Sequence, residues 1–292
     1  MNRRHAELAL AANTVIWGAT FVLVKAALRD VSPMLFLALR FTLAAAALAV
    51  LFRRRLAAGF DWRAALAGAL VGTFLFAGFL LQTLGLRLTT PPKSAFLTGL
   101  TSVLVPFVAA LVYRNRPQVS ELLGVLVATA GLGLMTLEGV ITAINPGDLL
   151  TLVCAIGFAA HIVTLGHFSE QMSFEILSVT QIAAAALWAS ALFWWAEKPH
   201  VEWRPAVVWA ILITGLLATA LAFTIQAWAQ QYTTSTRTAL IYMLEPVVAW
   251  VTSYAIVGEG LSRRAAVGAA LILGGVLLVE MKPLNSRQHQ SR

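Results

Sequence analysis

Residues 226 to 250 read QAWAQQYTTSTRTALIYMLEPVVAW, an apolar run that carries an acid, Glu245, directly before Pro246. A charge at the centre of a lipid bilayer costs about 2.5 to 3.5 kcal/mol on insertion scales, so an acid in such a run needs a reason. The chain also holds an earlier copy of this region. A shift of 144 residues places Gln226, Thr233, Thr234, Arg237 and Thr238 on Gln82, Thr89, Thr90, Lys93 and Ser94.

The composition is that of an integral membrane protein. Of the 292 residues, 59% are hydrophobic and only 12% are charged, which is too apolar for the surface of a soluble domain. The net charge of +8 comes from short basic clusters between apolar runs, which favours lipid head groups as partners and argues against nucleic acid. The single cysteine, Cys154, excludes a disulfide framework and a cysteine metal site. We expect no metal and no cofactor.

The apolar runs predict ten membrane-spanning helices, because about 20 mostly apolar residues are needed to cross a bilayer. Prolines such as Pro33, Pro146 and Pro205 lie near the expected helix starts, where a missing amide hydrogen costs little. The expected spans cover residues 8–28, 33–52, 62–86, 92–113, 119–138, 147–167, 175–195, 205–230, 235–256 and 264–281.

The internal copy extends over most of the chain and predicts two five-helix repeats. Trp62 recurs as Trp203 at a spacing of 141, and from Gln82 onward the spacing is 144. Since five is odd, the second repeat enters the membrane from the opposite side, as is common in secondary transporters. The sequence therefore predicts an all-α membrane protein of ten transmembrane helices in two inverted repeats, residues 1–141 and 142–292.

Loop charges predict the orientation. Lys and Arg, including Arg53, Arg54 and Arg55, are more numerous in the loops on the side of the two termini, which favours termini in the cytoplasm and an inner-membrane location. The first apolar run continues beyond a plausible signal-cleavage site, so we interpret it as a retained helix.

Polar residues follow one face of several expected helices. Thr238, Tyr242 and Glu245 lie on one face of the ninth span, because their spacing matches the helical repeat. Similar stripes follow the first, fourth and sixth spans, which predicts one shared site between the repeats near the membrane midplane. The stripes on these spans are Asn13, Trp17 and Thr20; Ser94, Thr98 and Thr101; Cys154, Phe158 and His161.

These features resemble the EamA-type permeases of the drug/metabolite transporter superfamily. The resembling segments are WGATFVLVKAAL from Trp17, SPMLFLALRF ending at Phe41, LQTLGLRLTTPPKSAFLTGLTSVLVP ending at Pro106, and YMLEPVVAWVTSYAIVGEGLS from Tyr242. The resemblance implies ten helices in two repeats and transport of a metabolite. It does not select a substrate, because amino acids, sugars and nucleotide conjugates are all associated with this family.

Several residues admit two interpretations. Glu245 is either a protonatable group on the solute path or a structural partner of another helix. Arg40 reaches a similar depth in the second span, so it either pairs with Glu245 or extends to the outer interface. His161 either relays protons or donates one structural hydrogen bond, and the second interpretation is favoured. Lys93 and Arg237 begin corresponding helices and are interpreted as interface anchors, although they could also attract an anionic solute.

The remaining expected roles are close helix packing, gating and contact with the solute. Gly124, Gly131, Gly268 and Gly275 allow a close approach of helices, either within the chain or in a homodimer. We expect gating or structural roles for Arg40, Gln82, Gln226 and Pro246. We expect the solute to contact Trp17, Thr20, Thr98, Thr101, His161, Tyr242 and Glu245.

Three classes of function fit a polytopic membrane protein, namely a transporter, a membrane-embedded enzyme such as a lipid-modifying enzyme, and a scaffold without flux. The chain contains none of the HExxH, DDxxD and GxSxG strings of enzymes and no Walker A loop. A scaffold has no need of two inverted copies of a polar helix face. The sequence therefore predicts a non-enzymatic secondary transporter, an exporter of a small metabolite such as an amino acid by alternating access.

Overall fold

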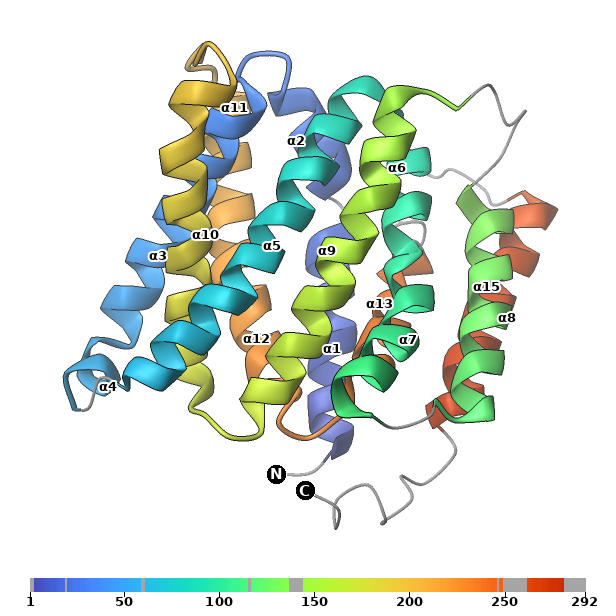
Figure 1. Cartoon of the computed structure of the whole chain (residues 1–292). Helices are drawn as coiled ribbons and strands as arrows, with labels where there is room; N and C mark the ends of the chain where they lie inside the picture. The colour runs from blue at the N-terminus through green and yellow to red at the C-terminus, as the bar shows by residue number, and fades with distance from the viewer. Residues whose placement is uncertain are drawn as a thin grey trace.

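Helices that run up and down form nearly the whole of the described chain (Figure 1). The structure is a computed structural model, and it describes residues 3–18, 20–58, 61–114, 117–136, 144–245, 247–248 and 262–280. The one isolated β-bridge among these residues joins Val31 to Val201.

The first five predicted spans are present, with ends within a few residues of those expected. Residue 19 of the first span lies outside the described residues, and a break at Leu100 divides the fourth span. Between the second and third spans lies a short, exposed helix that carries three arginines, α4 (Arg53–Ala58). The spans are α1 (Arg3–Gly18) with α2 (Thr20–Ala27), α3 (Pro33–Leu51), α5 (Trp62–Leu88), α6 (Pro91–Gly99) with α7 (Thr101–Tyr113), and α8 (Val119–Thr136).

The second five spans are also present, although the latter part of the ninth lies outside the described residues, as does Pro246. The eighth span contains a π-helical section, which the sequence analysis did not predict. The elements are α9 (Pro146–Ser169), α10 (Phe174–Ala196), α11 (Pro205–Leu212), the π-helix η1 (Ile213–Leu221), α12 (Ala222–Ala229), α13 (Ser235–Tyr242) and α15 (Arg263–Glu280).

The local sequence explains where several helices begin. Pro33, Pro91, Pro146 and Pro205 occupy the first helical position of α3, α6, α9 and α11, as predicted. At the start of α9 the Asn145 side chain accepts a hydrogen bond from the backbone of the third helical residue, whose own side chain accepts one from Asn145. These caps satisfy amide hydrogens that would otherwise lack partners.

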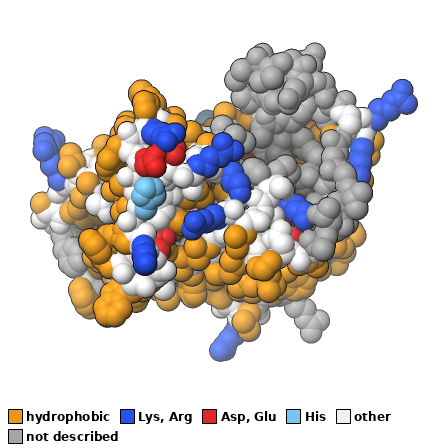
Figure 2. All heavy atoms as spheres, turned by 90° about the horizontal axis from the view of Figure 1, so that it is seen from above, with side chains coloured by type: hydrophobic (Ala, Val, Ile, Leu, Met, Phe, Trp, Pro, Cys, Tyr) orange, Lys and Arg blue, Asp and Glu red, His pale blue; other side chains and the backbone are white. Residues whose placement is uncertain are grey.

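The helix surfaces match a lipid environment. Seven helices or helix runs within the described residues are long and apolar enough to cross a membrane, and α8 contains a shorter apolar segment. Large apolar side chains face outward, for example Leu111, 81% exposed, and Leu187, 72% exposed. Figure 2 looks onto the end where α6, α9 and α11 begin, and there charged side chains gather while hydrophobic ones form much of the rim. The predicted fold class, an all-α membrane protein, is confirmed.

Corresponding helices of the two halves pack against each other. α3 contacts α10 and α8 contacts α15, and each of these pairs joins a helix to its counterpart 141 to 144 residues away; α7 contacts α13, which joins the fourth span to its counterpart, the ninth. Such self-pairing is what a two-fold relation between two copies produces. α1 begins and α15 ends at one end of the molecule, while α6 and α9 begin at the other (Figure 1).

Four glycines bring α8 and α15 close together. A Cβ atom built on Gly124 would lie 2.8 Å from the carbonyl oxygen of Gly275, and one built on Gly131 would lie 2.5 Å from that of Gly268. The contact is reciprocal, because a Cβ on Gly275 would lie 2.6 Å from the Gly124 carbonyl oxygen. The glycine face is therefore used within the chain, which removes the observation that suggested a homodimer.

We expect Gly275→Ala to lower the free energy of unfolding by about 1 to 3 kcal/mol, because the added methyl group meets backbone atoms that cannot move aside. Gly274→Ala is the matched control, since a Cβ there meets no atom within 4 Å. Thermal unfolding of the purified variants in detergent measures the difference. Equal melting temperatures for the two variants would contradict the close crossing.

Candidate functional site

Two side chains of α1 attach it to the π-helical region of the eighth span. The indole Nε1 of Trp17 donates to the Ala218 carbonyl at 2.9 Å, and Asn13 Nδ2 donates to the Ala222 carbonyl at 2.9 Å. Irregular turns of this kind often occur at functional sites in helices. The first helix of one repeat is thus joined to the third helix of the other.

Aromatic rings form a row through the middle of the bundle. Tyr242 lies edge-on to Trp17 at 4.7 Å between ring centroids, and Trp17 is 5.5 Å from Phe223. Phe223 is 6.0 Å from Phe79, which is 5.1 Å from Phe158. We call these five residues the aromatic row. It takes rings from α13, α1, α12, α5 and α9, so it crosses the interface between the repeats.

The repeat explains the arrangement of the row. Phe79 and Phe223 are counterparts at a spacing of 144, and Trp17 and Phe158 are counterparts at 141. The contact of Phe79 with Phe223 therefore lies at the pseudo-two-fold axis, and the contacts Trp17–Phe223 and Phe158–Phe79 on either side of it mirror each other. Sequence reasoning missed Phe79 and Phe223, although the spacing that revealed the repeat could have found them, because the search followed polar residues only.

Arg40 lies against Phe79, one ring short of the Phe158 end of the row. It is 4% exposed, its Nε donates to Thr219 Oγ1 in η1 at 2.7 Å, and its guanidinium carbon is 4.4 Å from the centroid of the Phe79 ring. No acid pairs with Arg40 among the described residues, so the suggested Arg40–Glu245 ion pair is wrong for this part of the chain. The buried position of Arg40 is confirmed, since it does not extend to the interface.

Glu245 lies near the other end, by Tyr242. Its side chain is half-buried, and it has no hydrogen bond or ion pair with any described residue. The Tyr242 hydroxyl and the Asn13 side chain are buried beside each other, and neither makes a hydrogen bond of normal geometry through the hydroxyl or Oδ1 to any other described residue. Glu245 is thus the group at this end of the row that lacks a polar partner among the described residues, and buried polar groups usually have one.

The expected residues of the fourth span form a second group beside the sixth span. Gln82 Nε2 donates to Thr98 Oγ1 at 3.1 Å, and Thr98 Oγ1 lies 3.7 Å from Cys154 Sγ. Thr101 Oγ1 donates to the Ala155 carbonyl at 3.5 Å. The structure therefore brings Gln82, Thr98 and Thr101 together. Thr98 and Thr101 contact α9, the helix that carries Phe158.

His161 has a structural partner. Its Nε2 lies 2.9 Å from Gln181 Oε1 of α10, and its ring is edge-on to Phe223 at 5.4 Å. The favoured interpretation, a single structural hydrogen bond, fits this contact. Gln181 was not expected from the sequence, because no spacing rule relates it to His161.

Two expected residues are bonded locally and not to the row. Thr20 donates to the backbone carbonyl of Trp17 at 2.7 Å, and Gln226 donates to Gln230 Oε1 at 3.2 Å. Gln226 differs here from its counterpart Gln82, because Tyr242 occupies the position that corresponds to Thr98. Among the described residues, no group of three or more His, Cys, Asp or Glu side chains could hold a metal ion.

The fold and this site define a multi-pass membrane protein built from two copies of one unit. The sequence profile of the EamA-like transporter family matches residues 5–137 and 145–281, once in each half. The chain belongs to the EamA-like transporter family, whose members are transporters and not enzymes.

Relatives and a solved structure agree with this assignment. An uncharacterized transporter of Archaeoglobus fulgidus is 35% identical over 97% of this chain and 88% of its own length. The uncharacterized transporter YoaV of Bacillus subtilis is 22% identical over 91% of this chain and 93% of its own length. One crystal structure superposes with a TM-score of 0.75 at 20% identity, covering 94% of this chain and 96% of that chain, which shows a shared fold.

We expect Glu245→Gln to change the free energy of unfolding by less than about 1 kcal/mol, because no ion pair is lost. Breaking a buried ion pair typically costs about 3 to 5 kcal/mol. Thermal unfolding should therefore match that of Glu170→Gln, a similar change on an exposed residue. A large loss of stability for Glu245→Gln alone would assign this acid a structural role.

Proposed function

We propose that this chain is a secondary transporter that exports a small amino-acid-like solute across the inner membrane by alternating access. The proposed site lies between the repeats near the membrane midplane, where transporters with inverted repeats bind their solutes. Its proposed contacts are Trp17, Thr20, Thr98, Thr101, His161, Tyr242 and Glu245, with Arg40, Gln82, Gln226 and Pro246 in supporting or gating roles.

The observation that carries this proposal is the pair of unmatched charges along the aromatic row. Arg40 contacts Phe79, next to the Phe158 end, and Glu245 lies by Tyr242 at the other end. Charges inside a membrane are costly and usually serve a function. A zwitterion carries a carboxylate that can pair with Arg40 and an ammonium group that can pair with Glu245, so such a solute offers a partner to either charge as it moves along the row.

The neighbouring groups fit the same class of solute. The guanidinium of Arg40 is held by Thr219 through Nε, which leaves its two terminal nitrogens to bind a carboxylate with two parallel hydrogen bonds. The Tyr242 hydroxyl, which lies next to both Glu245 and the Asn13 side chain, adds a polar group that a solute can contact. The aromatic row between them offers an apolar surface for a side chain.

The energy source follows from what the sequence contains. A Walker A loop is absent from the chain, so an ion gradient or exchange of solutes is the proposed driving force. Glu245 is the proposed proton carrier if a proton gradient is used, because an acid without a fixed cation can change its charge during the cycle.

Counterflow in proteoliposomes tests the solute class. Vesicles loaded with a mixture of amino acids should take up one or more labelled amino acids, and Arg40→Gln or Glu245→Gln should each reduce the rate about tenfold or more, equal to about 1.4 kcal/mol. Arg204→Gln, a change of an exposed arginine, is the control. Full activity of both site variants, or uptake of purely cationic or anionic solutes only, would refute a zwitterion site.

Labelling of introduced cysteines tests the proposed orientation. In a Cys154→Ser background, Lys198→Cys should react with a membrane-impermeant maleimide from outside the cell, and Arg54→Cys should react only after the membrane is opened. Both positions are exposed, and α4 and the end of α10 lie at opposite ends of the molecule (Figure 1). The reverse pattern would place both termini outside.

A further inference from the structure

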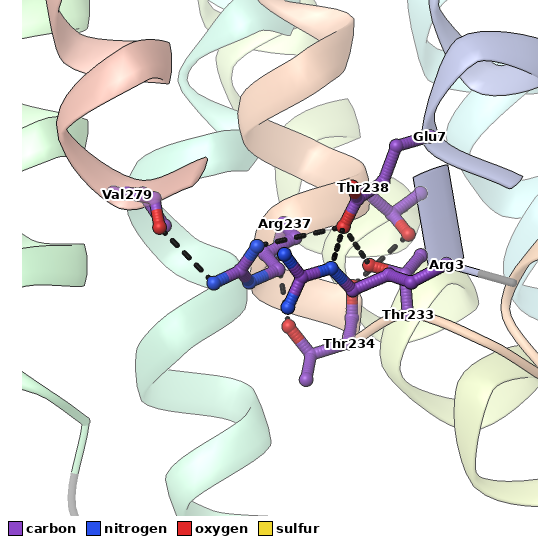
Figure 3. A network of polar contacts seen from close by, with 7 residues as sticks. All are labelled: Arg3, Glu7, Thr233, Thr234, Arg237, Thr238 and Val279. Carbon is purple, nitrogen blue, oxygen red and sulfur yellow. Dashed lines mark hydrogen bonds and ion pairs between the residues drawn. The ribbon is translucent and has the colours of Figure 1, made fainter. Parts of the chain in front are cut away.

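An ion pair joins the starts of α1 and α13. Glu7 Oε1 lies 3.5 Å from Arg237 Nη1, and the side chains are only 11% and 3% exposed. Thr233 Oγ1 donates to the same carboxylate at 3.1 Å, and Arg237 Nη2 donates to the Val279 carbonyl of α15 at 3.0 Å. Figure 3 shows these groups converging from three helices. Arg237 is therefore a buried partner of Glu7 and not an interface anchor.

A second ion pair of the same construction joins the starts of α9 and α6. Lys93 Nζ lies 3.2 Å from Asp148 Oδ2, with side chains 21% and 8% exposed. The Thr89 hydroxyl donates to the other carboxylate oxygen of Asp148. Each pair thus consists of an acid near the start of one helix, a base near the start of another, and a threonine four residues before the base.

The two ion pairs are counterparts in the internal repeat. Arg237 corresponds to Lys93 at a spacing of 144, and the threonines beside them share that spacing. Glu7 corresponds to Asp148 at a spacing of 141, as Trp17 corresponds to Phe158. The bonding is crossed, because each acid belongs to one repeat and its base belongs to the other.

The two pairs lie at opposite ends of the molecule. α1 and α13 begin at one end, and α6 and α9 begin at the other (Figure 1). Each pair also holds together the helices that carry part of the proposed site. α1 and α13 carry Trp17 and Tyr242, which lie 4.7 Å apart. α6 and α9 carry Thr98 and Cys154, which lie 3.7 Å apart.

Distance along the helix links each pair to the site. Trp17 follows Glu7 by ten residues, which is about 15 Å of helix at 1.5 Å per residue. Separation of α1 from α13 at the Glu7–Arg237 pair would therefore open a route of that length to the contact between Trp17 and Tyr242. The same separation of α9 from α6 would open a route from the opposite end to Thr98.

We propose that the Glu7–Arg237 and Asp148–Lys93 pairs are the two gates of the transport cycle, and that each breaks when its own end of the protein opens. This inference rests on the proposed function, since gates have meaning only for alternating access. The base of the first gate is the more deeply buried, since Arg237 is 3% exposed and Lys93 is 21% exposed, so the first gate opens less readily. The resting protein therefore favours opening at the end of α6 and α9.

Distances between spin labels at each end test the gates without knowledge of the solute. In a Cys154→Ser background, one labelled pair at Arg4→Cys and Tyr232→Cys reports the end of α1 and α13. A second pair at Thr90→Cys and Leu149→Cys reports the end of α6 and α9. All four positions are exposed. Double electron–electron resonance on purified protein in lipid nanodiscs gives the distance distribution for each pair.

Each gate variant should act at one end only. Glu7→Gln should add a population at longer distance for the labels on Arg4 and Tyr232, and should not lengthen the other distance. Lys93→Gln should do the reverse. Thr233→Val removes only one hydrogen bond of the first gate, so we expect a weaker shift in the same direction. This variant replaces Glu7→Gln in the test if Glu7→Gln does not fold.

Arg3→Gln is the matched control. Arg3 also pairs with Glu7, at 3.2 Å, but both residues lie on α1, so this pair does not join two helices. Its removal should leave both distances unchanged. Two results would contradict the proposal: distances that stay unchanged in both gate variants, or distances that lengthen equally at both ends in each variant. Either result would show that the two ion pairs are static structural bonds. Neither result affects the proposed solute class, because counterflow measures that separately.

Discussion

Polar groups inside a lipid bilayer have no water to bind, so they must find partners within the protein. Most of the polar side chains in this bundle do so. Lys25 donates to three carbonyls at the end of α5, those of Leu86, Arg87 and Thr89, at 2.6 to 3.0 Å. His161 is paired with Gln181 of α10. These bonds join helices that apolar contacts alone would hold less specifically, because lipid tails are as apolar as leucine.

The exceptions to this rule lie at the proposed site. Arg40 has only a threonine and aromatic rings as partners, and Glu245 has none among the described residues. Tyr242 and Asn13, which lie beside each other, are on the same side of the row as Glu245. A static protein would gain stability by replacing these groups with apolar residues. Their presence is better explained by a ligand that completes their bonding for part of a cycle.

The sequence predicts the helices well because their causes are local. Runs of about 20 apolar residues, and prolines such as Pro33 and Pro146 at first helical positions, are sufficient to locate most ends. The pairing of helices is not local. Arg40 and Glu245 lie at a similar predicted depth, but α3 packs on α10 and η1, whereas Glu245 follows α13 beside α1. Depth along a helix does not say which neighbour a side chain faces.

The internal repeat could have located more of the site than the search for polar stripes found. A spacing of 144 relates Phe79 to Phe223, but these residues are apolar and so did not enter the search for polar stripes. The ion pairs at the two ends were missed for another reason. The spacing is 141 near Glu7 and Asp148 and 144 near Lys93 and Arg237, so the two halves of each pair do not align under one shift. The π-helix in the eighth span left no signal in the sequence.

The crossed bonding of the two ion pairs bears on how such a chain could have arisen. Within the first half, Glu7 and Lys93 lie at opposite ends and cannot meet, and the same holds for Asp148 and Arg237 in the second half. A half-length ancestor would therefore satisfy its acid and its base only by assembling with a second copy in the opposite orientation. Fusion of two such genes fixes one copy in each orientation and frees each pair to diverge, here to glutamate with arginine and to aspartate with lysine.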